Sequence, residues 1–254
     1  MKMKTMYPAI LIAAAFALLV ISVPVYASNM DDGIESSAKK TYVFKTYLKD
    51  DDIKIQSKDG AVTLTGTVAE ESHRALAKET VAGLPGVKSV DDKLEVKGEA
   101  PAPNSDAWLG AKVKFALLFH KSVSAGETGV NVQDGIVTLQ GVAASQAQKE
   151  LTTEYARDVE GVKDVKNEMT VSKTAKKTPE TTGGKIDDAS ITAQVKMALL
   201  FHRSTSTLST TVTTKRGVVT VGGKAKNEAE KDLVAKLVRD IHGVKSVKNK
   251  MTIE

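Results

Sequence analysis

The 254-residue sequence contains no cysteine and few aromatic side chains. Without cysteine the chain forms no disulfide, and no thiol follows the N-terminal segment to accept a lipid, so a bacterial lipoprotein is excluded. Phe, Trp and Tyr make up 4% of the residues, too few for the stacking platforms that bind single-stranded nucleic acid. The formal charge of +5 is also too small for a nucleic-acid-binding composition. The fold must therefore rest on ordinary apolar cores, and we expect no nucleic-acid partner.

Only the N-terminus carries a long apolar run, and it has the features of an export signal. Lys2 and Lys4 precede the apolar run from Ala9 to Ile21, and Val25-Tyr26-Ala27 is a small-residue cleavage pattern. The run is shorter than the ~20 residues of a membrane-spanning helix. We expect residues 1–27 to be a signal peptide removed after Ala27, with an uncleaved anchor as the alternative. Export of a chain without disulfides indicates the bacterial periplasm.

A five-residue motif, Gly86-Val87-Lys88-Ser89-Val90, recurs near the end of each third of the remaining chain, at residues 161–165 and 243–247. The offsets are 75 and then 82 residues, and an internal repeat of this kind indicates an array of like modules. The same offsets relate other positions: Gly60, Gly135 and Gly217; Gly66, Gly141 and Gly223; Phe44, Phe119 and Phe201. The sequence therefore predicts module 1 at 31–97, module 2 at 105–172 and module 3 at 187–254, joined by linkers at 98–104 and 173–186.

Each module has the pattern helix, strand, strand, helix, strand. In module 3 the first helix follows Asp187 or Asp188 as the N-cap, and Asp-Gly pairs in modules 1 and 2 (Asp59-Gly60 and Asp134-Gly135) predict tight hairpins between the first two strands. Two helices on one face of a three-stranded sheet make a small two-layer sandwich. We therefore predict an α+β protein: three tandem αββαβ sandwiches, each with a three-stranded mixed sheet and two helices.

Two motifs in each module resemble the BON domain (bacterial osmotic-stress and nodulation type). In module 2 they are Asp134-Gly135-Ile136-Val137-Thr138-Leu139-Gln140-Gly141 and the segment from Gly161 to Val171. A signal peptide followed by BON repeats is similar to the hyperosmotically inducible periplasmic proteins. The resemblance implies interaction modules, often proposed to contact phospholipid membranes, with some members acting as chaperone-like factors. It transfers no catalytic residue and no cofactor.

Nine glycines in the repeated motifs are expected to serve backbone geometry, because they lie at turns, strand ends and helix ends where positive φ is common. They are Gly60, Gly66, Gly86, Gly135, Gly141, Gly161, Gly217, Gly223 and Gly243.

The charge differs between modules: modules 1 and 2 each carry −2, whereas module 3 carries +5. Basic side chains near an anionic leaflet contribute roughly 1 kcal/mol each, so module 3 is the candidate membrane contact, although an unevenly charged soluble face remains the alternative. In the last strand Lys248 and Lys250 are expected on the side opposite Met251 and Ile253. The candidate basic contacts are Lys231, Lys236, Lys245, Lys248 and Lys250.

The first helices of modules 2 and 3 are apolar almost all round, with Trp108, Phe115 and Met197 outside the expected core stripe. Helices of this kind are buried on more than one side. The sequence leaves two interpretations open. Modules 2 and 3 dock on each other, or these residues form an exposed patch that contacts lipid or unfolded client chains.

The titratable residues show no catalytic or metal-binding pattern. His120 and His202 each follow Ala-Leu-Leu-Phe at a helix end, where an imidazole interacts favourably with the last carbonyls. Acidic pairs such as Asp31-Asp32 and Asp91-Asp92 are expected to be solvated caps and turns. We therefore expect no metal, no cofactor and no enzymatic activity. The sequence predicts a periplasmic envelope stress-response protein that binds phospholipid surfaces, with a chaperone-like or scaffolding role toward envelope proteins as the alternative.

Overall fold

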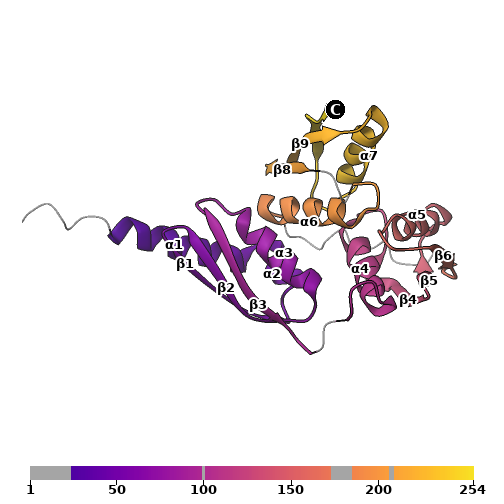
Figure 1. Ribbon diagram of the computed structural model, residues 1–254, viewed down its shortest axis with the longest axis horizontal. Helices are drawn as coiled ribbons and strands as arrows, with labels where there is room; N and C mark the ends of the chain where they lie inside the picture. The colour runs from indigo at the N-terminus through magenta and orange to yellow at the C-terminus, as the bar shows by residue number, and fades with distance from the viewer. Residues whose placement is uncertain (1–23, 99–100, 173–184, 206–208) are drawn as a thin grey trace, which may run out of the picture.

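The computed structural model describes residues 24–98, 101–172, 185–205 and 209–254, and the apolar run of the expected signal peptide lies outside them. The chain forms three similar α+β units, each with a small mixed sheet covered by helices (Figure 1). The predicted fold class is confirmed.

Module 1 is the most extended unit. Strands β1 (Asp52–Lys58) and β2 (Ala61–Val68) form an antiparallel hairpin, and β3 (Ser89–Val96) lies parallel to β2. Helix α3 (Glu71–Ala82) connects β2 to β3. The first helix is broken into α1 (Pro24–Lys40) and α2 (Tyr42–Thr46). The break occurs at Thr41, whose hydroxyl donates to the Ala38 carbonyl and accepts from the Phe44 amide, so it ends one helix and caps the next.

Modules 2 and 3 share one layout with an interrupted last strand. Module 2 contains α4 (Asp106–Phe119), the 3-10 turn η1 (Ala125–Glu127), β4 (Thr128–Gln133), β5 (Ile136–Ala143), α5 (Gln146–Arg157), β6 (Asp164–Asn167) and β7 (Thr170–Val171). Module 3 contains α6 (Asp188–Phe201), β8 (Thr210–Lys215), β9 (Val218–Ala225), α7 (Glu228–Arg239), β10 (Ser246–Asn249) and β11 (Thr252–Ile253).

An asparagine lies at the interruption of the last strand in both modules. In module 3, Asn249 donates to the Lys231 carbonyl of α7 and accepts from the Met251 amide. Module 2 repeats both bonds through Asn167. In module 1 the equivalent residue is Asp92, which pairs with Arg74 at 3.0 Å, and β3 runs through without a break.

An aspartate at the start of each first helix binds the hairpin turn of its own module. Asp106 accepts from the amides of Asp134 and Gly135 at 2.7 and 2.9 Å. Asp188 accepts the equivalent pair in module 3, while the preceding Asp187 caps α6. Asp31 plays the same part in module 1 and is only 8% exposed. The expectation that Asp31 is a solvated surface residue was therefore wrong, because its carboxylate accepts hydrogen bonds from the Ser57 hydroxyl and from both turn amides.

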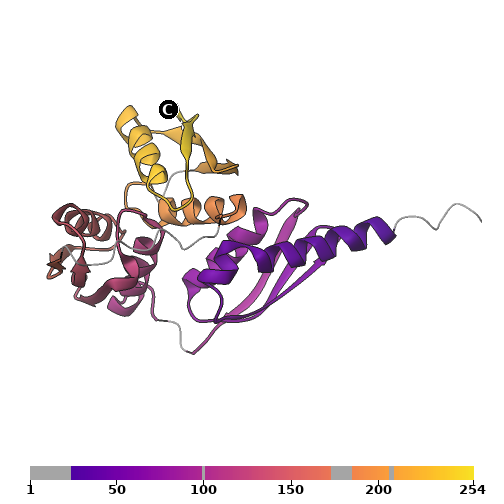
Figure 2. The ribbon, with the colours of Figure 1, turned by 180° about the vertical axis from the view of Figure 1, so that it is seen from behind.

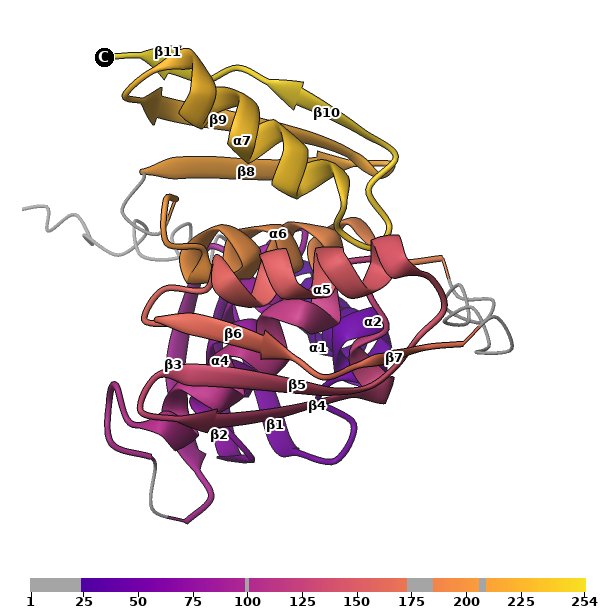
Figure 3. The same ribbon diagram turned by 90° about the vertical axis from the view of Figure 1, so that its right-hand side faces the viewer.

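Helices α3, α4 and α6 meet at the centre of the molecule, and the three sheets lie around them (Figures 1 and 2). Helix α6 contacts both α3 of module 1 and α4 of module 2, and the view in Figure 3 shows it between the sheet of module 3 and the other two modules. One hydrophobic cluster accordingly joins modules 1 and 3 and includes Phe115 and Phe119 of module 2, whose remaining core forms a second cluster. Modules 2 and 3 are thus docked through their first helices, and module 1 joins them through α2 and its second helix α3.

Candidate functional site

Modules 2 and 3 dock through a reciprocal contact with pseudo-twofold symmetry. His120 at the end of α4 pairs with Ile241 in an antiparallel bridge, and His202 at the end of α6 pairs with Val159 in the same way. His202 lies 82 positions after His120, and Ile241 lies 82 positions after Val159. This number is the repeat offset between modules 2 and 3, so the two bridges are equivalent. Both modules therefore use one surface for the contact, as the subunits of a twofold-symmetric dimer do.

Backbone hydrogen bonds repeat on both sides of this contact. The amide of Lys121 donates to the Asp240 carbonyl at 2.9 Å, and that of Arg203 donates to the Asp158 carbonyl at 2.8 Å. The flanking bonds match in the same way, from His242 to Phe119 and from Glu160 to Phe201. These bonds satisfy the carbonyls at the ends of the helices, which have no partner within the helix.

A histidine faces an aspartate on each side of the contact. His120 Nδ1 lies 3.3 Å from Asp240 Oδ2, and His202 Nε2 lies 3.6 Å from Asp158 Oδ2. Both imidazoles are buried. The histidines do end their helices, as the sequence analysis expects, but their aspartate partners belong to a different module. Module 1 has Lys45 and Gly83 at these positions and takes no part in such a pair.

Asp240 is held by three side chains of module 2. The Tyr155 hydroxyl donates to it at 2.7 Å, Ser122 donates to its other oxygen, and the Tyr155 ring stacks on His120 with centroids 3.7 Å apart. Burial opposes ionisation of Asp240, but His120, Ser122 and Tyr155 together outweigh it and hold the pKa below its usual value. The pKa of Asp158 is lowered mainly by His202.

The serine, histidine and aspartate of this cluster do not have the order of a hydrolase triad. In a triad the imidazole lies between the hydroxyl and the carboxylate. Here the Ser122 hydroxyl is bonded to Asp240 itself, so the arrangement serves the docking of modules rather than activation of a nucleophile.

Two of the predicted contact residues lie inside the molecule. Phe115 and Met197 are each 2% exposed and belong to the cluster that joins the modules. Phe115 meets the rings of Phe119 and Phe201 edge to face. The hypothesis of an exposed apolar patch at these residues is corrected by this arrangement, because each one fills the junction between first helices. Docking, the other interpretation left open by the sequence, is the one that the structure has.

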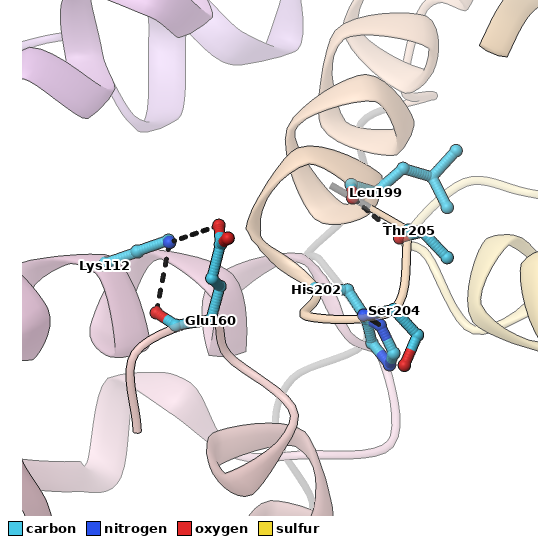
Figure 4. A network of polar contacts seen from close by, with 6 residues as sticks. All are labelled: Lys112, Glu160, Leu199, His202, Ser204 and Thr205. Atoms are coloured by element: carbon cyan, nitrogen blue, oxygen red, sulfur yellow. Dashed lines mark hydrogen bonds and ion pairs between the residues drawn. The ribbon is translucent and has the colours of Figure 1, made fainter. Parts of the chain in front are cut away.

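Trp108 lies at the edge of the same junction, above a buried lysine that the sequence analysis missed. Lys112 Nζ is 4.8 Å from the centre of the Trp108 ring. It donates to the carbonyl and the carboxylate of Glu160 at 3.1 and 3.3 Å (Figure 4). Burial lowers the pKa of Lys112, and Glu160 opposes that shift. The signal in the sequence was a lysine within an otherwise apolar helix. Its partner could not be identified from the sequence, because Glu160 lies 48 positions further along the chain.

The end of α6 is fixed in the same region by local bonds. The Thr205 hydroxyl donates to the Leu199 carbonyl at 2.7 Å, and the Ser204 amide donates to His202 Nδ1 at 3.1 Å (Figure 4). The bond from Ser204 holds Nδ1 of the ring, and Nε2 faces Asp158.

Module 1 holds the other end of α6. The backbone amides of Tyr42 and Val43 donate to the side chains of Asp187 and Ser190 at 2.7 and 3.1 Å. Lys196 forms an ion pair with Glu79 of α3 at 2.7 Å. Helix α6 is therefore bound at its N-terminus by module 1 and at its C-terminus by module 2.

The candidate lysines of module 3 divide between two sides of its sheet. Lys231 and Lys236 lie on α7, where Lys231 is half-buried and faces Glu228 at 3.5 Å. Lys245 is exposed and precedes β10, with its aliphatic chain against Gly217 of the hairpin. Lys248 on β10 and Lys250 beyond it are both exposed. The structure does not bring all five lysines to one surface.

Within the described ranges, no three His, Cys, Asp or Glu side chains are grouped so that they could hold a metal ion. None of the helices in the same part of the chain has the length and apolar character needed to span a bilayer.

All nine predicted turn glycines have positive φ, from +78° to +124°. Gly66, Gly141 and Gly223 lie inside the second strand of each module, two residues before its end, rather than at the end itself.

Comparison with known proteins identifies the repeated unit. The model of the BON domain family matches residues 30–98, 105–173 and 187–254. Osmotically-inducible protein Y of Escherichia coli (strain K12) is 31% identical over 189 residues, which cover 74% of this chain and 91% of that protein. An uncharacterized protein of Anaplasma centrale is 28% identical over 116 residues, 44% of this chain and 77% of its own length.

Among solved structures, CdsD, a structural protein of the type III secretion system of Chlamydia trachomatis, matches with 17% identity and a TM-score of 0.23 over 87% of this chain and 90% of its own. A similarity at that level says nothing about how the three modules are arranged.

Proposed function

Because this chain belongs to the BON domain family, we propose that it is a non-enzymatic stress-response protein of the bacterial envelope that binds anionic phospholipid surfaces through module 3. The similarity to an osmotically inducible protein supports the stress-response role. The N-terminal features of an export signal support a periplasmic location.

One observation supports the lipid-binding proposal: the three modules share one fold but differ in net charge. Modules 1 and 2 carry −2 each and module 3 carries +5. An anionic leaflet attracts basic segments and repels acidic ones within about one Debye length, ~8 Å at physiological salt. Module 3 therefore provides the binding surface, and modules 1 and 2 stay on the side away from the membrane.

The alternative role, binding of unfolded clients, requires an exposed apolar surface. The residues that would provide it, Phe115 and Met197, are buried between modules. The larger apolar side chains that are exposed lie apart in the sequence: Met30 before module 1, Val171 in module 2, and Leu200 and Ile253 in module 3. Client binding would thus require the modules to separate, and the closed arrangement favours the lipid surface.

Sedimentation with vesicles tests the proposal. Residues 28–254 are expected to co-sediment with vesicles that contain phosphatidylglycerol but not with vesicles of pure phosphatidylcholine. Binding is expected to fall as salt rises from 50 to about 500 mM, because exposed charges are screened. Equal binding to both kinds of vesicle, or none to either, would contradict the proposal.

A further inference from the structure

The sheet of module 3 has one face covered by helices and one face open. Helices α6 and α7 contact β8, β9 and β10, and Val212, Val219 and Val221 are buried beneath them. Side chains alternate between the two faces along a strand. The intervening residues, such as Thr211, Thr213 and Lys248, are exposed and point away from the helices. We call this side the open face of the module.

The open face of module 3 is basic and carries no acidic residue on its strands. Four of its side chains are lysines, from β8, from β9, from β10 and from the residue that follows β10. The eleven positions of the face are Thr211, Thr213, Lys215, Val218, Thr220, Gly222, Lys224, Ser246, Lys248, Lys250 and Thr252.

The same eleven positions in the other modules carry mixed charge. Module 1 has three lysines and two acidic residues there: Lys54, Lys58, Lys93, Asp91 and Glu95. Module 2 has one lysine and two acidic residues: Lys166, Asp164 and Glu168. The open faces thus carry +1 in module 1, −1 in module 2 and +4 in module 3. Since the fold and the strand register are common to all three, the difference is one of surface chemistry alone.

The lysines on the helix side of module 3 share α7 with acidic residues, although Lys236 is exposed there. Lys231 is half-buried beside Glu228, and α7 also carries Glu230 and Asp232. The aliphatic chain of Lys245 lies against the hairpin, as that of Lys163 does in module 2, where Nζ donates to the Asp134 carbonyl. The basic charge of module 3 is therefore divided between α7, where it is mixed with carboxylates, and the open face, which carries four lysines and no acidic residue on its strands.

We infer that the open face of module 3 is the surface that docks on anionic phospholipid headgroups, with α6, α7 and the other modules directed away from the membrane. This inference rests on the proposed function and specifies the contact within it. The face carries no large apolar side chain, so the protein lies on the headgroups and inserts nothing into the hydrocarbon. Four lysines on one small sheet match the charge of an anionic leaflet, and the acidic residue beside the face, Glu254, follows β11 at its edge.

A matched pair of double variants tests this assignment in residues 28–254. Lys215→Gln with Lys248→Gln removes two charges from the open face, and module 2 already carries glutamine (Gln133) at the position of Lys215. Lys231→Gln with Lys236→Gln removes two charges from α7. Each lysine near an anionic surface contributes about a fivefold factor. The first pair is therefore expected to weaken partition onto phosphatidylglycerol vesicles by about 30-fold, and the second by less than about threefold.

The outcomes separate this inference from the proposed function. Equal weakening by both pairs, or greater weakening by the α7 pair, overturns the open face while the lipid-binding function stands. Absence of binding by the unmodified protein overturns both. Circular dichroism and thermal melting of each variant verify that the fold is retained.

The single tryptophan gives an independent readout. Trp108 lies in module 2, so vesicles with brominated acyl chains are expected to leave its fluorescence unquenched when the open face of module 3 is bound. Quenching of Trp108 would place the contact on α4 and overturn the inference.

Discussion

At the scale of single residues, the glycine inside the second strand of each module is demanded by the neighbouring backbone. A Cβ added at Gly66, Gly141 or Gly223 would lie 2.0 to 2.2 Å from a backbone carbonyl oxygen at, or one residue before, the start of the preceding strand, and the φ of each is above +110°. The short distance excludes a side chain because its Cβ would overlap a backbone oxygen that cannot move. The positive φ excludes it because residues other than glycine are strained there.

Gly141→Ala is therefore expected to destabilise the protein by about 2–4 kcal/mol, since φ strain and a backbone clash add. Gly33→Ala is the control, because Gly33 lies within helix α1 with no atom within 4 Å of the added Cβ. That change is expected to stabilise by up to about 1 kcal/mol. Denaturant unfolding measures both, and equal effects of the two changes would contradict the geometric explanation.

At the scale of elements, the helix ends of modules 2 and 3 meet in a symmetric contact. Because both modules contribute the same surface, either one could make this contact with a second copy of itself. The contact needs a histidine after the first helix and an aspartate after the second, and modules 2 and 3 have both. Lys45 and Gly83 replace them in module 1, which instead binds the start of α6 through backbone amides. Two residue types thus determine which modules pair in this way.

Asp240→Asn is expected to lower stability at pH 7 by about 1–3 kcal/mol, because the charged acceptor of Tyr155 and Ser122 is lost. The pKa of Asp240 in the folded protein lies below the ordinary 3.8, so the unfolded chain binds this proton more readily. The stabilisation is present above about pH 4 and disappears as pH falls through the folded pKa.

The difference in melting temperature between the unmodified protein and this variant should therefore shrink from pH 6 to pH 3. Asp232→Asn, an exposed position on the same helix, serves as the control and should show little effect at either pH. A difference that stays constant with pH would show that the charge of Asp240 does not stabilise the contact.

At the scale of the whole molecule, α6 makes the three modules one unit. Ten of its fourteen residues are buried, under the sheet of its own module and against α3 and α4. A module of ~67 residues buries only about 60% of its unfolded surface. Sharing α6 supplies apolar contacts that module 3 would lack alone.

Thermal unfolding should accordingly be one cooperative transition, with equal calorimetric and van't Hoff enthalpies. Met197→Ala is expected to lower the stability of the whole chain by about 2–5 kcal/mol. Leu200→Ala, on the same helix but 50% exposed, should cost far less. Three separate transitions, or a Met197 effect confined to one of them, would show that the modules unfold independently.

Much of each module could be read from local patterns. The hairpins, the Asp187 cap and the turn glycines depend on residues a few positions apart, and local backbone preferences decide them. The side of the last strand on which Lys248 lies follows from alternation alone. Because the repeat offset relates equivalent positions, the pattern of one module also predicted those of the others. It predicted in this way that Phe119 is buried.

The arrangement of the modules was beyond such patterns. Periodicity shows that α4 and α6 are apolar all round, but it does not say what covers them, so Phe115 and Met197 could be assigned equally well to a docked or to an exposed surface. The partners of His120 and Lys112 are distant in the chain and become neighbours only when elements pack. Amino-acid order therefore decided the units and the charge of each. The packing of α3, α4 and α6 decided which surfaces remain open, because burial depends on what else occupies the space beside a side chain.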